Sequence, residues 1–155
     1  MYSKEEKSKL VKEFWTVFGK YLAPIYSAEG EKISWINYKS NFKSVKIFTE
    51  VNTKYAEIGF KILHSDPNIR FEIFNDLFNL KEQLETEIDG LLNWEINYED
   101  ENFVQFSKIS IVLEGINVLN KQDWPTIIQF LKPKLIAIDS FWCNWKYGFQ
   151  EKYSA

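Results

Sequence analysis

The sequence contains a single cysteine, a single histidine and a single arginine, and each scarcity excludes a class of protein. Cys143 alone cannot form a disulfide within the chain, which excludes a secreted scaffold held by cross-links. Cys143 and His64 together are too few for a zinc site of the usual Cys/His spacing, so we expect no metal and no cofactor. Arg70 is the only arginine, although paired contacts to guanine favour arginine, and this argues against sequence-specific DNA recognition.

Other absences exclude further classes of protein. Glycine (6) and proline (4) are too few for a collagen-like or low-complexity chain. The sequence has no glycine-rich phosphate loop and no apolar run of about 18 residues, so neither a nucleotide-binding loop nor a membrane span is expected. The first residues lack the apolar segment of a signal peptide. These features predict a protein of the reducing cytoplasm.

What the chain does have is aromatic side chains and a length typical of one domain. The 155 residues, with 45% apolar and 26% charged side chains, are expected to form a single domain over residues 1–155. Aromatic residues make up 17%, which is too much ring surface for a disordered chain.

The net charge of −3 hides an uneven distribution. Residues 66–101 carry a net charge of −9, whereas residues 1–65 carry +4 and residues 102–155 carry +2. The plain interpretation is a solvated acidic helix face. The alternative is an acidic surface for a basic partner.

Hydrophobic periodicity predicts an α+β fold with about five mostly antiparallel strands and three helices, in the order α-β-β-β-α-β-β-α. Ser3 and Glu6 have the spacing of a capping box at the start of the first helix, and Asp66-Pro67 marks the start of the second. The third helix begins near Asn120 or Asp123 and contains Pro133. The predicted strands lie at residues 33–38, 45–51, 55–62, 94–98 and 103–113.

One candidate catalytic set lies on two adjacent predicted strands. Glu50 and Glu57 flank a short turn, and Lys61 shares a strand face with Glu57 because the two are an even number of residues apart. Acidic residues with a nearby lysine are a feature of metal-dependent nucleases, but the usual Asp/Glu-X-Lys spacing is missing here. A solvated cross-strand ion pair explains the same residues.

A second candidate is a set of lysines interleaved with aromatic residues, a pattern that suits single-stranded nucleic acid. Its members are Trp35, Lys39, Lys43 and Lys46, with Tyr38, Phe42, Phe48, Lys54 and Lys61 nearby. The alternative is an ordinary sheet face whose rings belong to the core.

The third candidate is the aromatic end of the last helix, with rings at Trp142, Trp145, Tyr147 and Phe149. Because these rings point in at least two directions around a helix, we expect either the first helix or a second subunit to cover them. The sequence thus predicts self-association, most simply as a homodimer.

Several stretches together resemble an uncharacterised bacterial family, domain of unknown function 4268. They are residues 13–21 (EFWTVFGKY), 27–32 (SAEGEK), 35–38 (WINY), 120–125 (NKQDWP), 130–134 (FLKPK) and 139–142 (DSFW). The resemblance brings no established activity. In larger relatives such a domain follows nuclease-like segments, so the resemblance implies an association with nucleic acid or with defence. A stand-alone copy is expected to work with a separate protein.

From these observations we expect a non-catalytic binding or protein-interaction module. A small metal-dependent nuclease or hydrolase and a single-stranded nucleic-acid binder are the alternatives.

Overall fold

The first helix and the second helix both begin where the sequence predicts. In the computed structural model, which describes residues 1–153, α1 spans Lys4–Leu22 and starts with a capping box: Glu6 N donates to Ser3 Oγ and Ser3 N donates to Glu6 Oε1, both at 3.1 Å. At the second helix, Asn68 N donates to Asp66 Oδ1 at 2.9 Å and Pro67 occupies the first helical position.

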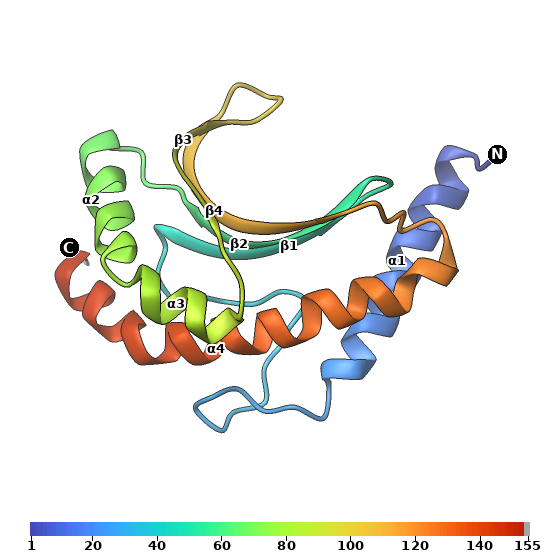
Figure 1. The fold of residues 1–155 in the computed structure, drawn as a ribbon, viewed down its shortest axis with the longest axis horizontal. Helices are drawn as coiled ribbons and strands as arrows, with labels where there is room; N and C mark the ends of the chain where they lie inside the picture. Colours follow the sequence, from blue (N-terminus) through green and yellow to red (C-terminus); the bar gives the residue numbers. More distant parts are fainter. Residues whose placement is uncertain (154–155) are drawn as a thin grey trace.

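Four strands form one antiparallel sheet in the order β1-β2-β4-β3, as Figure 1 shows. Their bounds are β1 Val45–Val51, β2 Tyr55–Ile62, β3 Asn93–Glu99 and β4 Gln105–Glu114. Asn52 closes the first hairpin, because its Oδ1 accepts from both Lys54 N and Tyr55 N at 2.8 Å. The sheet confirms an α+β fold.

The prediction of a fifth strand at residues 33–38 was wrong, since this segment is a loop. Its alternating apolar pattern comes from side chains that anchor the loop separately. Trp35 is buried and donates its indole N–H to Ile25 O at 2.9 Å, and Tyr38 donates its hydroxyl to Asp139. Buried side chains can alternate without a neighbouring strand, and periodicity alone does not distinguish the two cases.

The prediction of three helices was also wrong, because the segment after Asp66 is divided in two. α2 covers Pro67–Phe78 and α3 covers Lys81–Ile88, separated by Asn79 and Leu80. The break lets α2 contact the sheet while α3 runs along the last helix. The observed order is therefore α-β-β-α-α-β-β-α, with a 3-10 turn at Lys121–Asp123 before the last helix.

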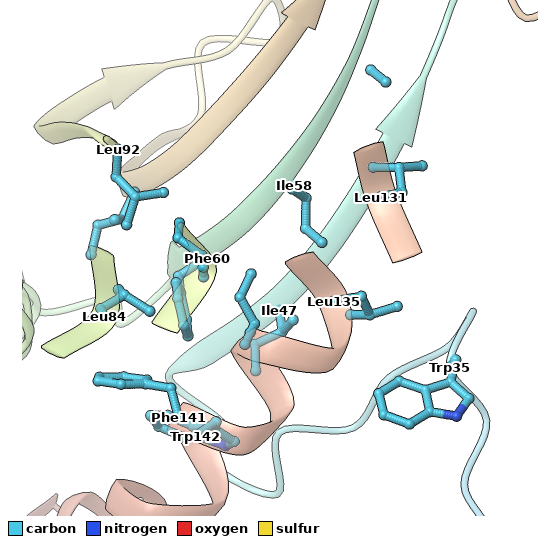
Figure 2. Close-up of a cluster of buried hydrophobic side chains, with 14 of the residues drawn as sticks. Trp35, Ile47, Ile58, Phe60, Leu84, Leu92, Leu131, Leu135, Phe141 and Trp142 are labelled. Carbon is cyan, nitrogen blue, oxygen red and sulfur yellow. The ribbon is translucent and has the colours of Figure 1, made fainter. Parts of the chain in front are cut away.

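The last helix, α4, spans Trp124–Tyr153 and continues across Pro133. Figure 1 shows α4 running beneath the sheet, with α3 packed alongside α4 at one end and α1 crossing α4 at the other. Figure 2 shows the core between the layers, where Ile47, Ile58 and Phe60 of the sheet meet residues of α4 such as Leu135 and Trp142. Among residues 1–153 no helix has both the length and the apolar character needed to cross a membrane.

The helices cover only one face of the sheet. On the opposite face, the hairpin of β3 and β4 bends away from the helices, so that this face is concave (Figure 1). We call it the concave face. It carries the polar residues of the strands, and the candidate site is built there.

Candidate functional site

The strand register places the sequence-predicted catalytic residues on the concave face. Glu50 of β1 lies directly opposite Glu57 of β2, and Lys61 lies opposite both Lys46 of β1 and Lys108 of β4. Like charges directly opposite one another destabilise a sheet unless they are compensated. Only one of these three lysines is paired with a carboxylate in the described structure.

That lysine is Lys108, which forms a buried ion pair with Glu57. Lys108 Nζ lies 3.1 Å from Glu57 Oε2, and Ser110 Oγ donates to the same oxygen at 2.7 Å. The Glu57 side chain is 6% exposed and the Lys108 side chain 10%. Within the described residues nothing donates to Glu57 Oε1. The two residues are not direct cross-strand partners. Lys108 is opposite Lys61, four residues from Glu57 along β2, so the two side chains meet diagonally across the strands.

The environment of Lys108 keeps it charged. Burial by itself lowers the pKa of Lys108, but the hydrogen bond to Glu57 and its negative charge outweigh burial and raise the pKa above the ordinary value. The ring of Tyr98 lies under the ammonium, with its centroid 3.7 Å from Lys108 Nζ. Both neighbours therefore favour the ammonium form at neutral pH.

Tyr98 reaches this face because of a bulge in β3. Glu95 pairs with Lys108 and Tyr98 pairs with Phe106, so three steps along β3 match two along β4. The simple alternation of the sequence predicts Tyr98 on the same face as Trp94 and Ile96. The extra residue reverses that alternation and turns Tyr98 towards the concave face.

Lys61 is held by rings rather than by a carboxylate. Its Nζ lies 4.5 Å from the centroid of Phe48 and 5.4 Å from that of Phe106. In the part of the chain that the structure describes, Lys61 forms no ion pair and donates no hydrogen bond. Its charge is thus available to a molecule in the cleft.

These side chains line a cleft with a volume of about 460 Å³. Its lip comes from the turn between β3 and β4, where Asp100, Glu101 and Asn102 line it. Asp100 holds this turn, because Oδ1 accepts from Asn102 N and Val104 N at 2.9 Å. Phe103 at the tip is 81% exposed with a φ of 63°, a conformation that bulky residues rarely adopt. Glu50 accepts from Tyr55 Oη at 3.0 Å on the opposite side.

The predicted lysine-aromatic set is divided between core and surface. Trp35 and Phe42 are buried in the core, so they present no ring for a base to stack on. Lys39, Lys43 and Lys46 are all exposed. The structure therefore brings these lysines to the surface without the rings that sequence analysis placed beside them.

The aromatic end of α4 is divided in a similar way. Trp142 and Phe149 are buried, Trp145 is 39% exposed and Tyr147 is 56% exposed. Trp142 packs on Phe42, Phe60 and Phe149 rather than on α1. Half of this predicted interface consequently belongs to the core.

A second polar cluster, which the sequence did not predict, surrounds Asp139 on the inner side of α4. Asp139 is almost fully buried, and it accepts hydrogen bonds from Ala28 N at 2.7 Å and from Tyr38 Oη at 2.5 Å. Cys143 Sγ lies 3.5 Å from the same carboxylate. The sequence feature that could have revealed this cluster is a single aspartate on the apolar face of a helix. Asp139 fastens the loop of residues 23–44 to α4.

The Cys143 thiol is expected to react slowly with alkylating reagents near neutral pH. Burial, together with the charge and the hydrogen bond of Asp139, raises the pKa of Cys143 to about 11. The rate of iodoacetamide labelling in the folded protein should thus rise with a midpoint near pH 11, and Asp139→Asn should lower that midpoint. Labelling at a mildly alkaline pH as fast as in urea-unfolded protein would contradict this.

Within residues 1–153, no group of three or more histidine, cysteine, aspartate or glutamate side chains is placed so as to hold a metal ion. The concave cleft is therefore described by its hydrogen-bonding and charged groups alone.

The fold and the site define an α+β protein with a polar cleft on the uncovered face of an antiparallel sheet. A family model described as "Domain of unknown function (DUF4268)" matches residues 10–146, and the chain belongs to this family. No curated protein and no solved structure matches the chain.

Proposed function

We propose that the protein is a non-catalytic binding module that takes a small polar ligand in the concave cleft. The observation that carries this proposal is the buried pair of Glu57 and Lys108 on the uncovered face of the sheet. A buried ion pair is not needed for stability, because apolar side chains of similar volume often make a fold equally or more stable. The pair leaves Glu57 Oε1 unused beside the cleft, where a ligand can donate to it.

The size and composition of the cleft agree with this role. Pockets for small molecules have volumes of roughly 300–1,000 Å³, and this cleft falls within that range. Tyr98 and Phe106 of the cleft, together with the neighbouring Phe48, hold the two lysines in place. A rigid, partly desolvated set of charges binds a polar molecule at a smaller entropic cost than flexible surface residues do.

A screen of small polar metabolites by ¹H–¹⁵N NMR tests the proposal. We expect at least one compound to shift the amide resonances of the cleft residues. The double variant E57Q/K108M removes both charges of the pair together and should reduce these shifts. The matched control is K121M, which breaks the exposed pair of Lys121 and Glu13 and should leave them unchanged. Shifts confined to other parts of the protein would refute the proposal.

A hydrolase is the second candidate, because Glu50 and Glu57 are direct cross-strand partners and Lys61 lines the same cleft. Two carboxylates and a lysine at such a site are suited to general acid–base catalysis. Incubation with single-stranded DNA and with model phosphodiesters, with and without Mg²⁺, would reveal cleavage. Under this candidate E50Q should lose the activity and K46M should keep it.

For the helical side of the molecule we propose self-association of two copies. The supporting feature is a groove lined by the half-buried Leu80 and the exposed Trp145, with the largely buried Phe149 also in its lining. Sedimentation equilibrium at micromolar concentration should give twice the monomer mass, and Trp145→Ala should shift the equilibrium towards monomer. A wild-type monomer under those conditions would remove this proposal.

A further inference from the structure

We propose that the concave cleft takes a small zwitterion of the amino-acid type, with its carboxylate at Lys61 and an amine at Glu57. This inference rests on the proposed binding function and specifies the chemistry of the ligand. It follows from two groups in the cleft that have no partner among the described residues. One is the ammonium of Lys61 and the other is Oε1 of Glu57.

The cationic end of the cleft is Lys61. A lysine usually either extends into water or pairs with a carboxylate, but Lys61 lies between two aromatic rings and, among the described residues, has neither an ion pair nor a hydrogen bond. The rings of Phe48 and Phe106 are both buried, so they hold the ammonium group at the side of the cleft. A fixed, unpaired ammonium is suited to one carboxylate of a ligand.

The anionic end of the cleft is Glu57 with the acidic lip. Lys108 and Ser110 fix one oxygen of the Glu57 carboxylate, so the other oxygen is a pre-oriented acceptor. Glu50 faces Glu57 across the hairpin, and Glu101 lines the opposite lip. An amine donates to such a carboxylate with a charge-assisted hydrogen bond, which is stronger than a neutral one.

The balance of charge selects a carboxylate over a phosphate. Four acidic residues line the cleft (Glu50, Glu57, Asp100 and Glu101), against two lysines. No arginine of the described chain lines it, although a planar guanidinium is the side chain that best grips phosphate at two points. A dianionic group would therefore meet net repulsion, whereas a zwitterion with an additional cationic group would be attracted. Basic amino acids have this chemistry.

The experiment compares L-lysine with 1,5-diaminopentane, which is the same molecule without its carboxylate. We expect lysine to bind about tenfold more tightly in an NMR titration, the usual advantage of a charge-assisted hydrogen bond. K61M keeps the length of the side chain and removes its charge, so it should bring the ratio of the two affinities close to one. L-Glutamate should bind more weakly than L-lysine.

Two variants separate the parts of the cleft. K46M removes the exposed lysine opposite Lys61, which does not line the cleft, and should leave the affinity ratio unchanged. E57Q/K108M should weaken both ligands by a similar factor and so preserve the ratio.

The outcomes distinguish this inference from the function on which it rests. Equal binding of lysine and the diamine to wild-type protein would overturn the zwitterion while leaving the binding site in place. The same holds if other metabolites shift the cleft resonances and none of these probes does. If neither the probes nor the metabolite screen shifts them, both proposals fall.

Discussion

Gly59→Ala is expected to destabilise the protein by at least about 3 kcal/mol, or to prevent folding. Gly59 of β2 pairs with Ser110 of β4, and a Cβ at this position would lie 2.0 Å from Ile109 O and 2.6 Å from Ser110 Cα. Both are backbone atoms, so no side-chain rotation relieves the contact. The two strands would have to separate in the middle of the sheet, beside the cleft.

Urea unfolding followed by circular dichroism measures this effect, and the chain supplies a matched control. Gly148 lies inside α4 with no atom within 4 Å of the position a Cβ would take. Gly148→Ala should therefore stabilise the protein by up to about 1 kcal/mol, since alanine is the better helix former. A Gly59→Ala variant that unfolds at the wild-type urea concentration would show that the strands are not this close.

Lys108→Met is expected to cost about 3–5 kcal/mol, because it leaves the Glu57 carboxylate buried without its cation. The double variant E57Q/K108M should regain most of this loss, since the amide oxygen of a glutamine at position 57 still accepts from Ser110 and no buried charge remains. Thermal and urea unfolding of the single and double variants complete the comparison.

The exposed pair of Lys121 and Glu13, with its 2.9 Å separation, provides the reference for this experiment. Lys121→Met should change stability by no more than about 1 kcal/mol, as is usual for solvated ion pairs. If Lys108→Met changes the free energy of unfolding by equally little, water must reach Glu57 freely. The Glu57 carboxylate would then not be pre-organised in the cleft.

The sequence predicts structure correctly where the determining contacts lie within a few residues of one another. The capping box at Ser3, the Asp66-Pro67 helix start and the short turn between Glu50 and Glu57 all stand as predicted. Each depends on backbone geometry that neighbouring residues determine. The helix break at Asn79 and Leu80 carried no such signal, because packing of α2 and α3 on different partners decides it.

In the candidate site, the sequence predicts which residues share a strand face but not which side chains meet. Periodicity placed Glu57 and Lys61 on one face, and the register shows Glu50 directly across from Glu57. The partners of these residues were not predictable. Lys108 meets Glu57 diagonally, although the two are not direct cross-strand partners, and Tyr98 turns to the concave face because of a bulge.

The first helix shows a similar limit. The apolar stripe at three- and four-residue steps along this helix predicts Trp15 as a buried ring at its centre, but Trp15 is only half-buried and Phe14 is fully buried instead. The two residues are neighbours in the apolar stripe, so periodicity does not decide between them. The position of α4 does, because Trp124 packs edge-on against Phe14.

The loop of residues 23–44 is fastened to α4 by individual hydrogen bonds between residues that are far apart in the sequence. The hydrogen bond from Ala28 N to Asp139 joins residues 111 positions apart, and the one from Trp142 Nε1 to Ser40 O joins residues 102 apart. Closing such long loops is slow in folding, and segments with few backbone bonds open first in the native state. We therefore expect this loop to form late in folding and to open in the native state before the strands separate. Detachment would expose Cys143 and Asp139 to solvent without unfolding the sheet.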